Sequence, residues 1–377
     1  MLPELKSLLD HLENTLDSER EAAIARLHHD ALHWKPVERL PLVLSYPIPH
    51  DTPFKPFPHR EIFDNPEKML YNELTDGFMT SIALRDRIDD DLPCSVRPNF
   101  GTVLVASMFG AHIEQTDDNP PWVRAFKELD EYDDALFRDI HDCNQGWCPK
   151  AVEVYEFFHE AFSRYPVVRE TVKIVLPDLQ GPIDTADLLR GCEIYPDFYL
   201  SPELAKRGFE KITEAQIALA DRFLPYTTDR RDGMTCQHAT YVRGQILIRN
   251  DSAIMVSPEM YREQVAEYDE RVLAAFDGGG VHACGSCQHV VKEFLRLPSI
   301  QCLDLGQPEM NDTEEIYELA SERQIPIIRI RVSEEYLTSG RVMRRFPTGV
   351  TLVHTADSFE DARRIVEEYK RACLAGA

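Results

Sequence analysis

The sequence predicts an α/β protein, a (β/α)8 TIM barrel preceded by an N-terminal helical extension. Three observations favour this class. Strand-like and helix-like segments alternate through the C-terminal third of the chain, which indicates a parallel sheet. About eight strand-like segments occur in all, and that number of repeats favours a closed barrel. The 377 residues are enough for such a barrel, and no low-complexity linker divides them. We therefore assign residues 1–35 to the extension and residues 36–377 to one barrel.

The composition restricts the possible functions. With 43% hydrophobic and 28% charged residues, the chain has the composition of a soluble globular protein. A net charge of −24 argues against nucleic acid as a partner, because phosphate binding needs a basic surface. We see no secretion signal and no apolar run of the roughly 18 residues that a membrane helix needs. Nine cysteines without regular spacing argue against a disulfide framework and favour the reducing cytoplasm.

The N-terminal elements follow from leucine spacing and prolines. Leucines from Leu5 to Leu16 recur at helical spacing, so we expect one helix over residues 2–33, ended by Pro36. This helix is compatible with an oligomer interface or with a cap on the barrel. The apolar segment Leu40–Tyr46 is the first expected strand. A helix is expected from about Asn65 to Leu84.

The middle of the chain contains two further expected strands. The acidic triplet Asp89–Asp91 is expected on a solvated face, and the apolar run Gly101–Phe109 is expected to be a strand. Residues from about 130 to 165 have a largely helical pattern. Thr171–Pro177 is rich in β-branched residues, as strands are. Ser201, Pro202 and Glu203 are a cap, a first-turn proline and a first-turn acid, which predict a helix to Phe223.

The C-terminal third has the clearest alternation. A strand is expected at Gln245–Arg249, and Ser257 begins a helix that runs to about Phe276. Four more strands are expected at Val281–Cys284, Ile300–Leu305, Ile327–Val332 and Val350–His354, each followed by a helical or turn segment.

Polar residues follow these strands at the points where the strands end. They are Asp178 and Gln180, Asn250 and Asp251, His282 and Cys284, Gln307 and Glu309, and His354. Each residue alone is explained equally well as a turn or helix-entry residue. The carboxyl ends of barrel strands meet at one mouth, however, where the active site of such enzymes lies. Together, these residues predict a metal site in a polar pocket.

The His282-Ala283-Cys284-Gly285 segment carries the strongest signal. Residues i and i+2 of a strand point to the same side, so His282 and Cys284 can face one ion, and Gly285 allows a sharp turn after them. An imidazole and a thiolate are ligands that suit zinc. The alternative is that Cys284 is a small buried residue and His282 a satisfied polar group at a strand end.

Several blocks of the sequence resemble the uroporphyrinogen decarboxylase superfamily, over roughly residues 35 to 370. They are Asp178-Leu179-Gln180-Gly181-Pro182, Leu189-Arg190-Gly191, Arg249-Asn250-Asp251 before Ser257-Pro258-Glu259, and the His282-Ala283-Cys284-Gly285 turn. The resemblance implies a (β/α)8 barrel, in agreement with the strand count.

Within the superfamily, the sequence is more similar to the cobalamin-dependent methyltransferases of the methylcobamide:coenzyme M type than to true decarboxylases. The latter bind their porphyrinogen with an arginine-rich N-terminal stretch, whereas residues 45–50 here read Ser-Tyr-Pro-Ile-Pro-His. The methyltransferases hold zinc with a His-x-Cys pair and a late cysteine. His282 and Cys284 match the pair, but Leu352–Asp357 lacks the late cysteine.

The third zinc ligand is therefore open. His354 is the first substitute, and Glu309 or Gln307 can supply an oxygen ligand. Cys287 is a nearer thiol but is expected in the first turn of a helix, and Cys302 is expected in the core of a strand.

The resemblance implies methyl transfer between a small-molecule donor or thiol acceptor and cobalamin, with zinc as the metal. No cobalamin motif is visible, so we expect a separate corrinoid protein as partner. The candidate catalytic residues are Asp178, Gln180, Asn250 and Asp251, which would orient the small molecule.

Two other functions remain open. One is a lyase that decarboxylates a small acid, with carboxylate bound by Arg190, by Arg249 or by the group Arg341, Arg344 and Arg345. The other is a barrel that binds a ligand or a corrinoid partner without catalysis, which the missing late cysteine favours.

Overall fold

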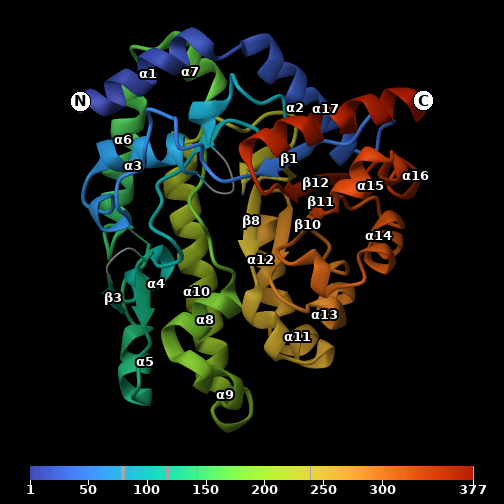
Figure 1. The fold of residues 1–377 in the computed structure, drawn as a ribbon. Coiled ribbons are helices and arrows are strands. Elements are labelled where there is room, and N and C mark those ends of the chain that lie inside the picture. Colours follow the sequence, from blue (N-terminus) through green and yellow to red (C-terminus); the bar gives the residue numbers. More distant parts are fainter. Residues whose placement is uncertain (78–80, 116–118, 142, 238, 377) are drawn as a thin grey trace.

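The centre of the structure is a six-stranded parallel sheet (Figure 1). The computed structural model describes residues 1–377 except 78–80, 116–118, 142, 238 and 377. The strands lie in the order β1-β12-β11-β10-β9-β8, and every neighbouring pair is parallel. Their bounds are β1 Leu42–Ser45, β8 Ile246–Arg249, β9 Gly279–Ala283, β10 Ile300–Leu305, β11 Ile327–Arg331 and β12 Val350–Thr355. The strand and helix alternation predicted for the C-terminal third is confirmed.

Three smaller sheets accompany this one. β2 (Ser95–Val96) pairs in parallel with β5 (Lys173–Ile174), while β3 (His112–Glu114) with β4 (Trp122–Arg124) and β6 (Met234–Gln237) with β7 (Thr240–Arg243) are antiparallel hairpins. Backbone hydrogen bonds continue from both edge strands of the large sheet. Asp91 N donates to Leu42 O over 2.8 Å beside β1, and Arg249 N donates to Leu179 O over 3.2 Å beside β8.

Helices flank the strands and cover the faces of the sheet. They are α1 Pro3–Thr15, α2 Ser18–Leu32, α3 Pro66–Thr75, α4 Leu104–Met108, α5 Leu129–Ala135, α6 Cys148–Phe162, α7 Pro166–Thr171, α8 Pro182–Arg190, α9 Ile194–Leu200, α10 Pro202–Phe223, α11 Pro258–Gln264, α12 Ala266–Ala275, α13 Gln288–Phe294, α14 Thr313–Ser321, α15 Glu334–Thr338, α16 Arg341–Arg345 and α17 Phe359–Gly376. Within α17, Tyr369 fixes the helix to the chain before β1, because its hydroxyl bonds both Leu40 N and Leu40 O. Among the described residues, none of these helices combines the length and apolar character of a membrane span.

The predicted N-terminal helix is two helices. α1 ends at Thr15 and α2 begins at Ser18. The side chain of Asp17 accepts hydrogen bonds from Glu19 N at 2.9 Å and Arg20 N at 3.2 Å, and this cap starts a new helix. The helix predicted from Asn65 ends at Thr75, and part of the remaining prediction falls on residues 78–80, outside the described residues.

The strand predicted at Gly101–Phe109 is wrong, because this segment forms the short buried helix α4. A continuous apolar run does not distinguish a buried strand from a buried helix. Gly101, with φ of 60°, turns the chain just before the helix. The strand in this part of the chain is β2, whose two residues are too few to leave a pattern in the sequence.

The solvated face predicted for Asp89–Asp91 is wrong for two of the three residues. Asp90 and Asp91 are each only 1% exposed. They accept hydrogen bonds from the first strand, Asp90 from Leu44 N at 3.1 Å and Asp91 from Leu42 N at 2.9 Å. Buried backbone donors need such acceptors, so these carboxylates fasten their segment to β1.

Candidate metal centre

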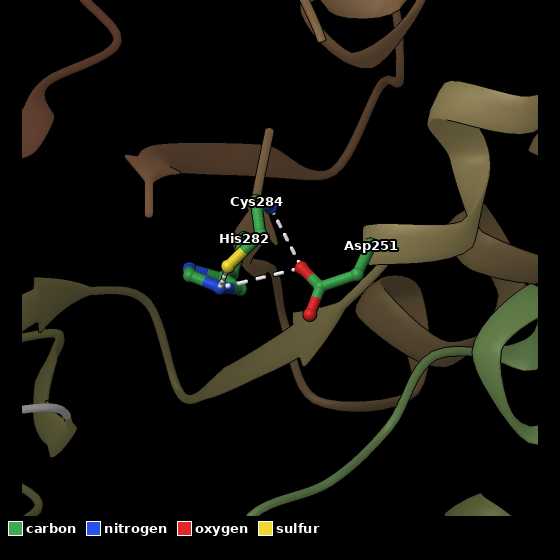
Figure 2. A group of neighbouring side chains, drawn as sticks. All are labelled: Asp251, His282 and Cys284. Atoms are coloured by element: carbon green, nitrogen blue, oxygen red, sulfur yellow. Dashed lines mark hydrogen bonds and ion pairs between the residues drawn. The ribbon is translucent and has the colours of Figure 1, made fainter. Parts of the chain in front are cut away.

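Three potential ligands meet where β8 and β9 end. Figure 2 shows the side chains of Asp251, His282 and Cys284 directed toward one another. His282 Nε2 lies 3.3 Å from Cys284 Sγ and 3.4 Å from Asp251 Oδ1. The ligand atoms of all three residues lie within 4.8 Å of one another. The pair expected from the i, i+2 spacing thus faces one point, and Asp251 joins it there.

Two glycines shape this corner. A Cβ at Gly306, which follows β10, would lie 2.5 Å from Cys284 Sγ and 2.8 Å from His282 Cε1. Only glycine therefore lets the chain pass the two ligands without a clash. Gly285 has φ of 74°, in the left-handed region that glycine favours, and its N–H donates to Gln307 Oε1 over 2.7 Å. The turn predicted after Cys284 is confirmed.

A buried carboxylate holds the imidazole from behind. His282 Nδ1 lies 2.8 Å from Asp304 Oδ2, and Asp304 is in register with His282 on the neighbouring strand β10. With Nδ1–H donated to Asp304, Nε2 carries the lone pair that faces Cys284 and Asp251. Metal-ligating histidines commonly donate their other N–H to a carboxylate in this way, which fixes both tautomer and ring orientation.

Arg329 neutralises that carboxylate. Its Nε donates to Asp304 Oδ1 and its Nη2 to Asp304 Oδ2, each over 2.9 Å. Arg329 has φ of 60°, which is unusual for a residue with a Cβ, and the pairing of β11 with β12 shifts register between Ile327 and Ile330. This irregularity places the guanidinium beside Asp304, and such strain is frequently retained at functional sites.

The backbone of Asp251 is held by a second buried acid. Asp184 accepts hydrogen bonds from Asp251 N at 3.0 Å and from Ser252 N at 2.7 Å. Burial and the neighbouring Asp251 carboxylate raise the pKa of Asp184 well above its ordinary value. Asp251 Oδ1 in turn accepts the N–H of Cys284 over 2.7 Å, while 45% of the Asp251 side chain stays exposed.

Cys284 must lose its thiol proton to bind a metal cation. Burial, followed by the nearby Asp251 carboxylate, raises the pKa of the Cys284 thiol to about 12. A divalent cation at this point would offset both effects and favour the thiolate. Imidazole nitrogen, thiolate sulfur and carboxylate oxygen are all zinc ligands, so the three residues fit that ion, with room in its tetrahedral shell for a fourth ligand.

Of the other candidate ligands, Gln307 lies at this corner through its hydrogen bond from Gly285 N, whereas His354, Glu309, Cys287 and Cys302 lie outside the group. His354 Nδ1 contacts Val332 O at 2.8 Å, and Glu309 is half-exposed and lies 3.6 Å from Arg331 Nε. Cys287 is buried immediately before α13, and Cys302 packs in the core of β10. The geometry therefore groups Asp251, and not these residues, with His282 and Cys284.

The remaining strand-end residues have separate contacts. Asp178 pairs with the guanidinium groups of both Arg97 and Arg249. Gln180 forms a parallel bridge with Arg249 and is buried. Asn250 is fully buried, and its Nδ2 donates to Asp269 and not toward the ligand group. Asn250 thus supports the loop that carries Asp251.

Sequence reasoning missed Asp304 and Arg329. Each is a charged residue directly between two apolar strand residues, in Leu303-Asp304-Leu305 and Ile328-Arg329-Ile330. A buried charge is costly unless it is paired, so an isolated charge in a strand between apolar neighbours could have indicated a partner in the same site.

Comparisons with known proteins add a fold likeness. No protein-family model matches the chain, and no curated protein shows significant sequence similarity to it. Among solved structures, a methyltransferase from Methanosarcina mazei is similar, with a TM-score of 0.58 and 16% identity over 92% of this chain and 95% of the neighbour. At this identity the likeness establishes a shared fold and extends over nearly the whole of both chains.

Proposed function

We propose that the protein is a zinc-dependent methyltransferase that moves a methyl group between a small molecule or thiol and a corrinoid carried by a separate protein. The observation that carries the proposal is the grouping of His282, Cys284 and Asp251, with Asp304 behind the imidazole. The structural neighbour is a methyltransferase, which supports the reaction class.

We also propose that the sheet closes into a (β/α)8 barrel. Two hydrogen bonds support closure, from Asp91 N to Leu42 O and from Arg249 N to Leu179 O, because they connect the two edge strands to the segments next to the β2–β5 pair. The ligand group would then lie at the carboxyl-end mouth, where barrel enzymes have their active sites.

Each residue has a defined part in this proposal. His282 Nε2, Cys284 Sγ and an Asp251 oxygen would hold the zinc, which as a Lewis acid lowers the pKa of a bound thiol or polarises a bound methyl donor. Asp304 and Arg329 keep the imidazole oriented. The exposure of Asp251 lets its carboxylate meet an incoming polar group.

The test uses free methylcobalamin in place of the corrinoid protein. Zinc-loaded protein is incubated with methylcobalamin and 2-mercaptoethanol, and loss of the methyl–cobalt bond is followed by absorbance. We expect zinc-dependent turnover that Cys284→Ser lowers at least about 100-fold, as loss of a metal ligand should. The matched control is Cys192→Ser, an exposed cysteine away from the ligand group, which should retain the wild-type rate.

A zinc-independent rate, or equal rates for wild type and Cys284→Ser, would contradict the proposal.

The second candidate function is the small-acid lyase, which the buried guanidinium pair around Asp178 favours. Release of CO2 from a small acid, without zinc and without a corrinoid, would support the lyase instead.

A further inference from the structure

Both peptide groups that flank Cys284 are held by side chains from other segments. The N–H of Cys284 donates to Asp251 Oδ1 over 2.7 Å, and the N–H of Gly285 donates to Gln307 Oε1 over 2.7 Å. Orienting the peptide planes on either side of a residue fixes its φ and ψ, and therefore the direction of its Cα–Cβ bond. These two hydrogen bonds thus set how the Cys284 side chain leaves the backbone, and its Sγ lies 3.3 Å from His282 Nε2.

Asn311 holds the next peptide group. Its Nδ2 donates to Gly285 O over 2.9 Å and to Gln307 O over 3.0 Å, while its Oδ1 accepts from Gln288 N over 2.9 Å. All three contacts agree with one orientation of the side-chain amide, since the nitrogen faces two carbonyls and the oxygen faces one N–H. Asn311 therefore joins the turn after Cys284 both to Gln307 and to the start of α13.

The segment that supplies these two side chains, residues 307–311, connects β10 with α14 and is anchored at both ends. Just before it, Gly306 N donates to Ala283 O over 2.9 Å. Just after it, Asp312 N donates to Oε1 of Gln288, the first residue of α13, over 2.7 Å. Because these anchors do not involve the turn itself, the segment can support the turn from outside.

The two groups that hold the Cys284 backbone differ in one respect. Asp251 belongs to the ligand group, so a bound cation would compete with the N–H of Cys284 for its carboxylate. The bond from Gly285 to Gln307 involves no atom of that group, so a cation does not compete for it. Gln307 is therefore suited to hold Cys284 in place both before and after an ion binds.

We propose that Gln307 and Asn311 are positioning residues for the metal centre. By holding the Gly285 peptide, they keep Cys284 directed toward His282 before an ion arrives. Neither side chain binds the ion itself, in contrast to the oxygen-ligand role considered for Gln307 from the sequence. A ligand that is already oriented loses less conformational entropy on binding, which raises affinity. The metal part of this inference rests on the proposed function.

The first measurement needs no metal. Amide hydrogen exchange at Gly285 is followed in the metal-free full chain. Gln307→Met keeps the size of the side chain and removes the acceptor, so Gly285 N–H should exchange about 3- to 10-fold faster than in wild type. Gln307→Glu keeps an acceptor oxygen and should retain the wild-type protection. Because Gln307 is exposed, neither substitution leaves a cavity in the core.

The second measurement is zinc affinity, by competition with a chelator. Gln307→Met should bind zinc about 3- to 10-fold more weakly, and Gln307→Glu at least as tightly as wild type. Asn311→Asp gives an independent variant, because it keeps the acceptor for Gln288 N and loses the donors to two carbonyls. It should weaken zinc binding by a similar factor.

The matched control is Gln301→Met. Gln301 lies near the start of β10, and its Nε2 donates to Asp277 O over 2.8 Å, away from the ligand group. This variant loses a side-chain hydrogen bond to the backbone, as the test variant does, and should bind zinc as wild type does.

Unchanged exchange at Gly285 in Gln307→Met, or wild-type zinc affinity despite faster exchange, would overturn the positioning role. Zinc binding that weakens equally in Gln307→Met and Gln307→Glu would also overturn it, because only the first removes the acceptor. The two proposals fail separately. Zinc binding with these variant effects but without methyl transfer would remove the transferase and keep the positioning role. Methyl transfer together with wild-type zinc affinity in Gln307→Met would do the reverse.

Discussion

Two buried carboxylate clusters in this protein have similar chemistry and different consequences. Asp91 is paired with Arg39, and Asp304 with Arg329, and neither carboxylate is more than 1% exposed. Asp91 also accepts the backbone N–H of Leu42, so its cluster attaches a segment to β1. Asp304 instead contacts the ring nitrogen of His282.

Burial and ion pairing alone therefore do not distinguish a functional charge from a structural one. Both clusters satisfy the requirement that a buried carboxylate be neutralised by a cation. What separates them is the third partner, a backbone amide in one case and a potential metal ligand in the other. The first cluster should control stability alone, and the second should control stability and metal affinity together.

The largest expected effect is on stability. Asp91→Asn leaves the Arg39 guanidinium without its counter-charge, so we expect the free energy of unfolding to fall by about 3–5 kcal/mol. Asp304→Asn should cost the metal-free protein a similar amount, because Arg329 loses the negative charge that accepts its Nε and Nη2 donors. Urea unfolding of both variants measures this, and wild-type stability in either would contradict the role of its ion pair.

Metal affinity then separates the two clusters. Asp304→Asn should weaken zinc binding about 10- to 100-fold, as removal of a carboxylate behind a ligating histidine generally does. Asp91→Asn, assayed where it is fully folded, should bind zinc as wild type does. Competition with a chromogenic chelator gives both affinities. Equal losses in the two variants would show that general stability, and not the contact to His282, sets the affinity.

Gly306→Ala tests the packing of the ligand corner without changing charge. The new methyl group would lie 2.5 Å from Cys284 Sγ, so we expect about 1–3 kcal/mol of destabilisation and weaker zinc binding. Gly233→Ala is the control for zinc affinity alone, because no atom lies within 4 Å of its added Cβ, although its φ of 73° costs stability in any residue with a Cβ. Unchanged zinc affinity in Gly306→Ala would contradict the close approach of this chain segment to Cys284.

The smallest effect near neutral pH concerns Asp269, which holds Asn250 behind the site. Burial raises the pKa of Asp269 from 3.8 to about 7. Between these two values the folded protein binds more protons than the unfolded chain, so this group lowers stability as pH rises through the window. Asp269→Asn should remove that slope. Chemical unfolding of both proteins across the window checks it, and a stability difference that does not change with pH would contradict the assignment.

The fold was predictable where its pattern is local and repeated. Strands β8 to β12 and their helices carry clear apolar runs and caps, and their order agrees with the expectation. The N-terminal half was harder, because β2 has two residues while the apolar run at Leu104–Met108 is a helix. Short strands that depend on neighbours for their pairing leave little trace in composition or periodicity.

The site, like the fold, was predictable only where its geometry depends on a single segment of the chain. His282 and Cys284 could be paired from the sequence because their geometry depends on one strand alone. The contact of Asp304 with His282 depends on the register between two strands, and that of Arg329 on an irregularity in β11, which periodicity does not reveal. Asp251 was recognised as a strand-end residue, but its place beside the two ligands follows from how β8 lies against β9.

The most direct test of the central proposal is the zinc content per chain of protein purified without chelator and supplied with zinc. The variants are Cys284→Ser and Asp251→Asn, with His354→Ala and Glu309→Gln as controls whose side chains lie outside the ligand group. We predict about one zinc per chain in the wild type and both controls, loss in Cys284→Ser, and loss or much weaker retention in Asp251→Asn. No zinc in the wild type, or full retention in Cys284→Ser, would contradict the metal centre. Loss in His354→Ala with retention in Asp251→Asn would contradict the choice of Asp251 as third ligand.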